Sequence, residues 1–509
     1  MRDPVFPDLS AFADTYRRGE PQIVWTRLID DLETPVTAYL KLGHGKPYAF
    51  LYESVEGGAW RGRYSIIALD PDLVWRARGD RAEIASGDGV ARDAWVAETG
   101  TSLQSLRRLV AASRITLPPT LPPMAAGLFG VLGYDMIRLV EPLGPANPDP
   151  LDLPDAVMMR PQIVAVFDAV AQEIIVCTPV RPDPDVSAEA AHAAALTRVD
   201  SVRLALKAPL PVAAEPVPLS AAPLVSPVSR ADYGRMVDKA KDYIAAGDIF
   251  QVVPSHRFSA PFPRDPFAFY RSLRRTNPSP FLYYLNFGGF QLAGSSPEIL
   301  VRLRDGKVSI RPIAGTRRRG KTPEEDQALE AELLADPKER AEHLMLLDLG
   351  RNDVGRAVMP PPGSNLPLKG KRVRVTETFV IERYSHVMHI VSNVEGDAPP
   401  NVDPIDVILT ALPAGTLSGA PKVRAMQIID ELETVKRGIG YGGAAGYISA
   451  NGSVDTCIVL RTALFKDGVM HVQAGGGVVA DSDPDAEYEE TLHKSDALRR
   501  AAEEAWRFV

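Results

Sequence analysis

Short apolar or alternating runs recur along the whole chain and predict many β-strands. In the first part these runs are YAFLYES (48–54), GRYSIIAL (62–69) and QIVAVFDAV (162–170). Later ones are FLYYLNFGGFQLAGSS (281–296), VMHIVSNVEG (387–396), AAGYISANG (444–452), DTCIVLRTALF (455–465) and VMHVQAGGGVV (469–479). Alternation bounded by turn residues is typical of strands that are joined by short connections.

Helical periodicity appears between groups of these runs. It predicts helices over 102–113 and 188–206, and a third helix that Ser229 caps and Gly247 ends before a strand at Ile249. We therefore expect an α+β fold with a large, mostly antiparallel sheet system, like a β-sandwich, covered by helices. The segment 207–229, rich in Pro and Ala, predicts a linker between an N-terminal region (1–206) and a second domain (230–509).

Length and charge narrow the class of protein. A chain of 509 residues exceeds what one hydrophobic core usually supports. The formal net charge of -8 argues against nucleic acid or an anionic membrane surface as a partner. No signal peptide and no apolar run of spanning length are found, so we expect a cytoplasmic protein. Cys177 and Cys457 lie in apolar runs and are interpreted as buried core thiols.

An acidic stripe begins the last predicted helix, which follows the glycines of GGGVVADSDPDAEYEETLHKSDAL (475–498). At 100° per residue, Glu487, Glu490 and Lys494 share one face. Further along, the same face carries apolar residues, namely Ala497, Leu498, Ala501 and Ala505. This continuation predicts that the acids lie on the buried side. A solvent-exposed i,i+4 ion pair between Glu490 and Lys494 is the alternative.

A second acidic stripe lies in DPKERAEHLMLLDLGRND (336–353), where Glu339 and Glu342 share a face with Leu346 and Leu349. Two buried acidic pairs require neutralisation, and Mg²⁺ does this with one or two carboxylates, waters and substrate oxygens. Glu342 and Glu490 are then the predicted ligands. A structural salt-bridge cluster remains the alternative, with partners among Lys338, Arg340 and Arg351.

Several segments have the composition of anion sites. Gly475, Gly476 and Gly477 precede a helix, where backbone N–H groups can bind an anion, although such a run can equally form a tight turn. AGTLSGAPKVRAM (414–426) offers hydroxyls before a helix that starts near Pro421. RPIAGTRRRG (311–320) offers Gly315, Thr316 and four arginines, which suit a carboxylate or form a solvated loop.

Two polar residues lie within apolar strand-like runs. His389 alternates with Val387 and Val391 and, taken alone, is interpreted as a core histidine. Arg461 follows the run CIVL, and a buried arginine requires an anionic partner.

The motifs PIAGTRRRG, KERAEHLMLLDLGRND, TLSGAPKVRAM and AGGGVVADSDPDAEYEET together resemble the chorismate-utilising enzymes, most closely the members that form anthranilate. The strong motifs span about 250–498, and YAFLYESVEGGAWRGRYSIIAL is similar to the family's N-terminal regulatory region. The resemblance implies the family's fold and an Mg²⁺-dependent lyase that converts chorismate and ammonia to anthranilate and pyruvate.

Carried over by position, the resemblance implies a role for individual residues. Glu342 and Glu490 would be the Mg²⁺ ligands, with Glu339 and Glu487 holding its waters. His389 would be a general acid beside the 4-hydroxyl of chorismate. The implied substrate-binding residues are Gly315, Thr316, Thr416, Tyr441, Arg461, Gly475, Gly476, Gly477 and Lys494.

Two positions distinguish sister enzymes within the family. Gln251 stands where isochorismate-forming and salicylate-forming members carry a lysine that activates water. Ala314 stands where members that form aminodeoxychorismate carry a lysine. Both differences favour ammonia as the nucleophile and anthranilate as the product. An aminodeoxychorismate-forming enzyme and a catalytically silent tryptophan-binding subunit remain the alternatives.

The resemblance also implies partners and regulation. Neither cysteine lies in a Gly-x-Cys-x-Gly turn, so ammonia is expected from a separate glutamine amidotransferase subunit in a hetero-oligomer. L-Tryptophan is the expected feedback inhibitor. Its implied site comprises Glu53, Ser54, Arg63, Tyr64, Ser65, Asn277, Pro278, Ser279, Pro280 and Phe281. Tyr52 and Phe281 replace the family's usual leucine and tyrosine, and a changed sensitivity is expected.

Overall fold

The computed structural model describes residues 3–54, 62–210, 221–359, 373–384 and 387–508. The strands before the predicted linker are β1 (Val5–Phe6), β2 (Gln22–Ile29), β3 (Ala49–Glu53), β4 (Tyr64–Arg78), β5 (Arg81–Ser86), β6 (Val96–Ala97), β7 (Gly127–Leu132), β8 (Ala156–Asp168) and β9 (Glu173–Val180). The helices of this region are α1 (Leu9–Arg17), α2 (Pro35–Leu42), α3 (Asp88–Ala91), α4 (Ser102–Ala112) and α5 (Ala188–Lys207).

The second part of the chain supplies the remaining elements. Its strands are β10 (Gln251–Val252), β11 (Ser255–Pro261), β12 (Phe281–Asn286), β13 (Gln291–Ser296), β14 (Ile299–Arg304), β15 (Lys307–Ile310), β16 (Ile313–Arg318), β17 (Val373–Arg383), β18 (Val387–Asp397), β19 (Gly419–Ala420), β20 (Ala444–Ser449), β21 (Val454–Ile458), β22 (Thr462–Lys466) and β23 (Val469–Gly475). Its helices are α6 (Arg230–Ala245), α7 (Pro266–Thr276), α8 (Pro323–Ala335), α9 (Pro337–Ala357), α10 (Pro404–Ala411), α11 (Lys422–Leu432) and α12 (Pro484–Glu504).

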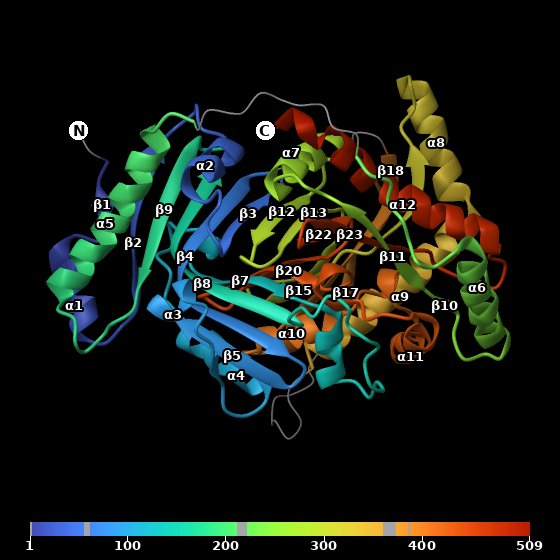
Figure 1. The fold of residues 1–509 in the computed structure, drawn as a ribbon, viewed down its shortest axis with the longest axis horizontal. Coiled ribbons are helices and arrows are strands. Elements are labelled where there is room, and N and C mark those ends of the chain that lie inside the picture. Colours follow the sequence, from blue (N-terminus) through green and yellow to red (C-terminus); the bar gives the residue numbers. More distant parts are fainter. Residues whose placement is uncertain (1–2, 55–61, 211–220, 360–372, 385–386, 509) are drawn as a thin grey trace.

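One antiparallel sheet system joins strands from both regions (Figure 1). One arm runs β1–β2–β9–β8–β4–β3–β12–β13–β22–β23–β11. A second arm starts again from β8 and runs β7–β20–β21–β14–β15–β18, with β16 and β17 also on β18. The predicted α+β class with a large antiparallel sheet is confirmed.

The two arms enclose an apolar core that includes Phe50, Phe129, Tyr283 and Leu464. Cys177 and Cys457 belong to this core, and both are buried free thiols, as predicted. The strand pairs β3–β12 and β7–β20 carry the sheet across the predicted domain boundary. The division at 206 and 230 stays a prediction, and part of the predicted linker (211–220) lies outside the described residues.

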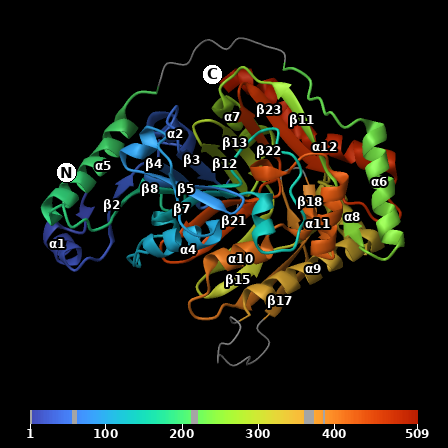
Figure 2. The ribbon, with the colours of Figure 1, turned by 60° about the horizontal axis from the view of Figure 1, so that its bottom comes forward.

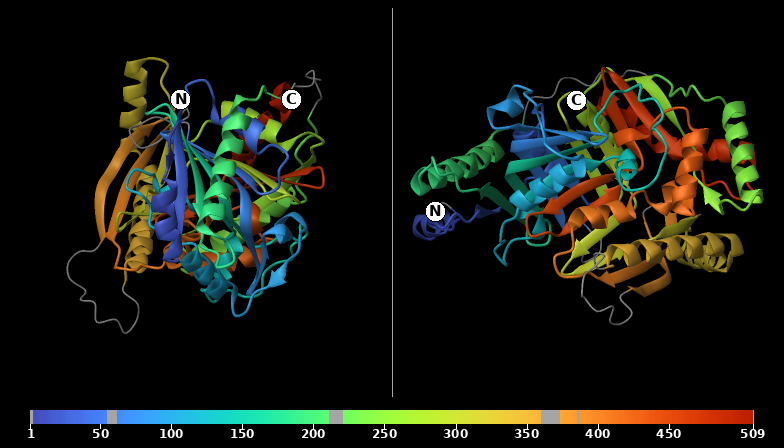
Figure 3. Two further views of the ribbon diagram at one scale, coloured as in Figure 1. Left: turned by 90° about the vertical axis from the view of Figure 1, so that its left-hand side faces the viewer. Right: turned by 90° about the horizontal axis from the view of Figure 1, so that it is seen from below.

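Helices cover the outer faces of the sheet. Several of them begin directly after an N-capping side chain. In Figure 2, α9, α10 and α11 lie together on the side of the second arm, while α6 and α12 lie at the far end from α1 and α5. Figure 3 shows α8 projecting from the body of the molecule. Ser229 caps α6 through a capping box, and Asp483 caps α12 by accepting the N–H of Ala486. Such caps satisfy N–H groups that have no partner within the helix.

Two local predictions need correction. The run DTCIVLRTALF is not one strand, because it divides into β21 and β22 around Arg461, whose φ of 44° lies in the left-handed region. The strand expected from Ile249 begins at Gln251 instead, where the pairing with β19 begins: Gln251 lies opposite Ala420, whose carbonyl also accepts the Phe250 N–H.

Candidate active site

The acidic faces of α9 and α12 come together. Burial raises the pKa of the Glu342 carboxyl, and Glu339 and Glu490 raise it further against the opposing charge of Lys494. The electrostatic effects of Glu490 and Lys494 on Glu342 require that the first turns of α9 lie close to the first turns of α12. Burial also raises the pKa of Glu487, and its Oε2 atom has no hydrogen-bond partner among the described residues.

The apolar continuation of both stripes is confirmed, but the predicted burial of Glu490 is wrong. Leu346, Leu498 and Ala501 are buried, whereas the side chains of Glu490 and Lys494 are 48% and 47% exposed. Lys494 Nζ lies 2.7 Å from Glu490 Oε1, which is the i,i+4 ion pair of the alternative interpretation. Leu498 and Ala501 pack in an apolar core with residues of α7 and β23, so the stripe changes from open to buried along one helix.

The carboxylates fit a hard cation only in part. Within the described ranges, no group of three or more His, Cys, Asp or Glu side chains lies close enough to hold a metal ion. Glu339 already pairs with Arg317 Nη1 at 3.1 Å and Glu490 with Lys494. Glu342 and Glu487, in contrast, are carboxyls whose charge the surroundings disfavour, and Glu487 has an unpartnered oxygen. Mg²⁺ needs few protein ligands, so these oxygen donors suit it.

The glycine run closes against the start of α12. Lys494 Nζ donates to the Gly475 carbonyl at 3.0 Å. A Cβ on Gly476 would lie 2.7 Å from Glu487 Oε2, and one on Gly477 would lie 2.5 Å from Gln251 Nε2. A methyl group at either position would displace the end of a flexible side chain, whereas a Cβ on Gly475 would lie 2.5 Å from the Pro254 carbonyl oxygen and glycine is required there. The approach of Gly476 to Glu487 makes the predicted substrate segment a neighbour of the predicted acidic residues, and the buried Gln251 lies against the same segment.

Gly315, Thr316 and His389 connect this group to the second sheet arm. The His389 Nδ1 atom lies 3.0 Å from the Gly315 carbonyl and 3.1 Å from Thr316 Oγ1. A carbonyl only accepts, so Nδ1 carries the proton and Nε2 is an acceptor in the neutral ring. Burial lowers the pKa of His389. On the other side, a Cβ on Gly315 would lie 3.1 Å from Glu339 Oε2.

Arg461 has a buried carboxyl group as its neighbour. The neighbour is Glu298, whose pKa burial raises to about 8, while Thr416 and Arg461 act in the opposite direction. Thr416 Oγ1 donates to Glu298 Oε2 at 3.2 Å. Burial lowers the pKa of Arg461, which also acts electrostatically on His389.

Sequence reasoning missed Glu298. The signal for it was the single acid in SSPEILV, immediately before an apolar strand. A carboxylate next to a buried strand is costly unless it has a partner, which indicates a functional or paired residue. Tyr441, a predicted substrate residue, is buried, and burial raises its pKa to about 12. Arg437 stacks on its ring at 5.3 Å and forms a buried ion pair with Glu433.

The arginines of RPIAGTRRRG are structural. Arg317 pairs with Glu332, Asp336 and Glu339, and Arg319 binds both oxygens of Asp326. Arg311 and Arg318 pair with other acids of the same region, Glu377, Glu382 and Glu325. These ion pairs link the segment to α8, α9 and β17, and binding of a ligand carboxylate by it stays a prediction.

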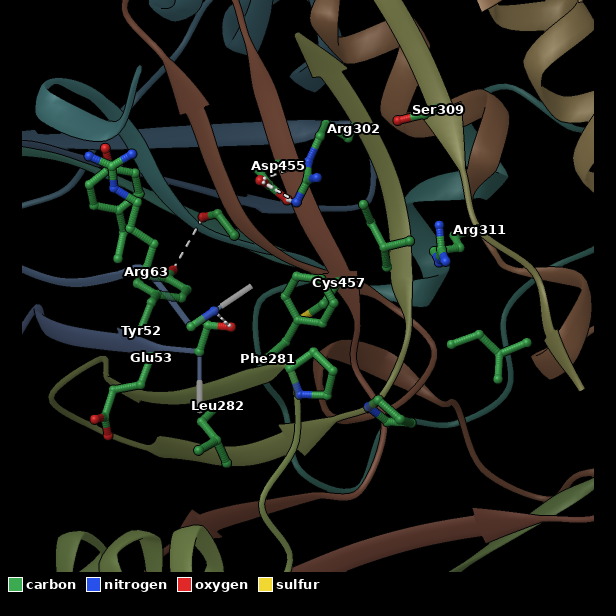
Figure 4. A pocket seen from close by; sticks show the side chains of 18 of the residues that line it. Tyr52, Glu53, Arg63, Phe281, Leu282, Arg302, Ser309, Arg311, Asp455 and Cys457 are labelled. Carbon is green, nitrogen blue, oxygen red and sulfur yellow. Dashed lines mark hydrogen bonds and ion pairs between the residues drawn. The ribbon is translucent and has the colours of Figure 1, made fainter. Parts of the chain in front are cut away.

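A separate cavity of about 1090 Å³ opens between β3, β12, β14 and β21 (Figure 4). Its volume slightly exceeds the roughly 300–1,000 Å³ typical of small-molecule sites. Of the residues predicted to bind tryptophan, the following line it: Glu53, Ser54, Arg63, Tyr64, Pro280 and Phe281. Ser65, Asn277, Pro278 and Ser279 do not line it, although Ser65 and Ser279 adjoin residues that do.

Two features shape the part of this cavity around β3. Glu53 accepts hydrogen bonds from Tyr270 at 2.5 Å and from Arg274 Nε at 3.0 Å. The Tyr52 hydroxyl donates to the Gly446 carbonyl at 3.2 Å, which places this ring against β20. Arg302 and Asp455 form an ion pair deeper in the cavity, and Arg311 lies on the opposite side from Arg63 (Figure 4).

The chain belongs to the chorismate binding enzyme family, whose sequence model matches residues 49–500. Anthranilate synthase component 1 of Cereibacter sphaeroides is 56% identical over 98% of both chains. The protein of the same name from Pseudomonas putida is 47% identical over 92% of this chain and 93% of its own.

Solved structures agree with this membership. Anthranilate synthase component I from Streptococcus pneumoniae has a TM-score of 0.74 at 35% identity, covering 93% of this chain and 98% of its own. The menaquinone-specific isochorismate synthase MenF from Escherichia coli shares the fold with a TM-score of 0.69 at 18% identity, covering 97% and 99%. In the described residues, none of the helices combines the length and apolar character needed to span a membrane.

Proposed function

We propose that the chain converts chorismate and ammonia to anthranilate and pyruvate. The observation that carries this proposal is a series of hydrogen bonds, an ion pair and electrostatic interactions that links the predicted site residues to one another and to Glu298. It runs from Lys494 and Glu490 through Glu342 and Glu339 to Gly315, and from His389 through Arg461 to Glu298 and Thr416. The names and near-complete coverage of the relatives support the same reaction.

Glu342 and Glu490 would hold Mg²⁺, with Glu339 and Glu487 holding its waters. When bound, the ion would polarise the ring carboxylate of chorismate as a Lewis acid. A bound cation would offset the burial, and the repulsion from neighbouring glutamates, that raise the pKa of Glu342 and Glu487. Glu490 would exchange its ion pair with Lys494 for the metal, which frees the ammonium group for the substrate. The exposure of both side chains is consistent with such an exchange.

The remaining residues would bind the second carboxylate and move protons. Arg461 and Tyr441 would take the enolpyruvyl carboxylate, together with backbone N–H groups at Gly477. The Glu298 carboxyl, with a pKa of about 8, carries its proton at pH 7 and can donate it to the departing 4-hydroxyl. The Nε2 atom of His389 is an acceptor in the neutral ring and suits a base or a hydrogen-bond acceptor better than an acid.

Ammonia would come from a separate glutamine amidotransferase subunit, which makes the working enzyme a hetero-oligomer. Burial raises the pKa of the Cys177 thiol to about 12 and that of Cys457 still further. A thiol of that kind does not act as a nucleophile at neutral pH. This supports a chain that uses ammonia without releasing it from glutamine.

The cavity beside β3 would bind L-tryptophan as a feedback inhibitor. Cationic Arg63 and aromatic Phe281 line it and would match the carboxylate and indole of an aromatic amino acid, although Arg63 already pairs with Asp168. Glu53 would take the ammonium group in exchange for one of its present partners, Tyr270 and Arg274. Tyr52 occupies space next to Gly446. We therefore expect the sensitivity to tryptophan to differ from that of relatives that have leucine at this position. Residues 1–206 would then form the regulatory region and 230–509 the catalytic one.

The test mixes the purified chain with chorismate, Mg²⁺ and ammonium at alkaline pH, and measures anthranilate fluorescence and pyruvate. Equal amounts of both products, lost on adding EDTA, are expected. Chorismate consumption without either product would indicate an aminodeoxychorismate-forming enzyme. No consumption, combined with thermal stabilisation by tryptophan, would indicate a silent regulatory subunit.

A further inference from the structure

Tyr233 of α6 is fully buried beneath the glycine run. It is not one of the predicted site residues. Its hydroxyl accepts the Gly476 N–H at 3.2 Å and donates to the Pro254 carbonyl at 3.1 Å. Burial raises the pKa of Tyr233 far above its usual range, so the hydroxyl keeps the proton that it donates. The oxygen is therefore oriented with its lone pairs toward Gly476.

Gly476 lies between this hydroxyl and Glu487. A Cβ on Gly476 would lie 3.5 Å from the Tyr233 oxygen and 2.7 Å from Glu487 Oε2. The other oxygen of Glu487 accepts from Ser482 Oγ at 2.6 Å, and Lys241 of α6 donates to the Ser482 carbonyl at 2.7 Å. Helix α6 thus holds both the glycine run and the loop before α12.

The Tyr233 ring is part of an aromatic cluster that fixes α12. The ring centroid lies 5.0 Å from that of His256 and 5.9 Å from that of Tyr488. His256 Nε2 lies 2.9 Å from Thr491 Oγ1. Tyr488 and Thr491 each adjoin a residue of the acidic stripe, so the cluster sets the rotation of the helix that presents Glu487 and Glu490.

We propose that Tyr233 is a positioning residue that fixes the Gly476 amide and, through it, the Gly475–Gly477 backbone against Glu487, so that its hydroxyl contributes to the affinity for chorismate. The proposal rests on the proposed function, in which this backbone binds the substrate. It assigns the hydroxyl to substrate binding and the ring to holding α12.

The test is Tyr233→Phe, which removes the hydroxyl and keeps the ring between His256 and Tyr488. The Gly476 N–H then loses its partner, and the KM for chorismate is expected to rise about tenfold with kcat within about twofold. Tyr39→Phe is the matched control, because Tyr39 is equally buried and its hydroxyl also donates to a backbone carbonyl, that of Ala49 at 3.1 Å. It should lower the Tm similarly without changing KM.

An unchanged KM in Tyr233→Phe, or an equal rise in Tyr39→Phe, would overturn the proposal. If Tyr233→Phe does not fold, Gly476→Ala tests the same contact, since the added methyl meets Glu487 and the Tyr233 hydroxyl; a KM at the wild-type value would then refute it. Failure of the proposed function is distinguishable, because the wild-type chain would form no anthranilate at all.

Discussion

Burial sets the protonation of the two titratable side chains nearest Arg461. It raises the pKa of Glu298 to about 8 and lowers that of His389. Both groups are therefore neutral near pH 7, one as a donor and one as an acceptor. Two side chains whose pKa values are shifted in opposite directions can serve in one site as general acid, here Glu298, and general base, here His389.

Glu298→Gln is predicted to lower kcat at least about 100-fold, because the amide cannot donate a proton to a leaving hydroxyl. In the wild type, kcat should fall as pH rises through about 8, where the Glu298 proton is lost. The unfolded carboxyl titrates near 4.5, so the free energy of unfolding should also fall between pH 4.5 and 8.

Steady-state rates and urea unfolding across that pH range check both effects. The variant should be less pH-dependent in stability than the wild type, because Gln does not titrate. A variant with wild-type kcat would remove Glu298 from proton transfer, whatever its effect on stability.

Glu490→Gln is predicted to lower kcat/KM at least about 100-fold and to raise the Mg²⁺ concentration needed for half-maximal rate. Its stability should change by less than about 0.5 kcal/mol, because the side chain is half exposed. Glu489→Gln is the control, since Glu489 contacts Arg230 on another face of α12. Equal Mg²⁺ dependence in the two variants would contradict a metal role for Glu490.

Residue periodicity predicted which acids meet but not how exposed they are. The stripe rule placed Glu487 and Glu490 on the face that becomes buried at Leu498. Burial at each turn depends on what covers it, and α12 is covered by α7 and α6, two helices distant in sequence, as well as by β23. Glu298 was missed for a related reason: its partners, Thr416 and Arg461, come together only through the fold.

At the scale of elements, β12 and β13 connect the tryptophan motif to Arg461. Asn277 Nδ2 donates to Ser295 Oγ at 3.3 Å, and Ser295 Oγ donates to the Asn277 carbonyl at 2.5 Å. The Ser295 N–H donates to the Arg461 carbonyl at 3.2 Å. One residue of β13 therefore contacts both the loop before β12 and the left-handed turn that carries Arg461, the arginine proposed to bind the substrate.

Ser295→Ala is predicted to weaken tryptophan inhibition about fivefold while leaving the KM for chorismate within about twofold without inhibitor. The change breaks the link to Asn277 and keeps the backbone bond to Arg461. Inhibition curves at several tryptophan concentrations measure the effect. Ser272→Ala, another fully buried serine, should leave inhibition unchanged; unaltered inhibition in Ser295→Ala would exclude this route.

Helices proved easier to predict than strand limits. Capping residues such as Ser229 and Asp483 act through local hydrogen bonds, which the sequence contains in full. Arg461 lies in a run that looks like one strand, yet the chain turns there because β21 and β22 pair with different partners, β14 and β13. That choice of partner is a long-range property of the sheet.

At the scale of the whole molecule, the pairs β3–β12 and β7–β20 make one hydrogen-bonded system from both regions. We predict a single calorimetric unfolding transition for the complete chain, because neither region closes its own sheet edges. Two resolved transitions, or a folded fragment of residues 1–206, would contradict this prediction.

The cavity of Figure 4 has walls from both regions, with Glu53 and Arg63 from one and Phe281, Asp455 and Cys457 from the other. Its recognition properties are thus encoded by two distant stretches of the gene. An exchange of the first 206 residues between relatives would transfer only part of the cavity lining, and with it only part of the proposed tryptophan site. Engineers who wish to move an inhibitor response from one such enzyme to another would need to graft β3 and β4 together with β12 and β21.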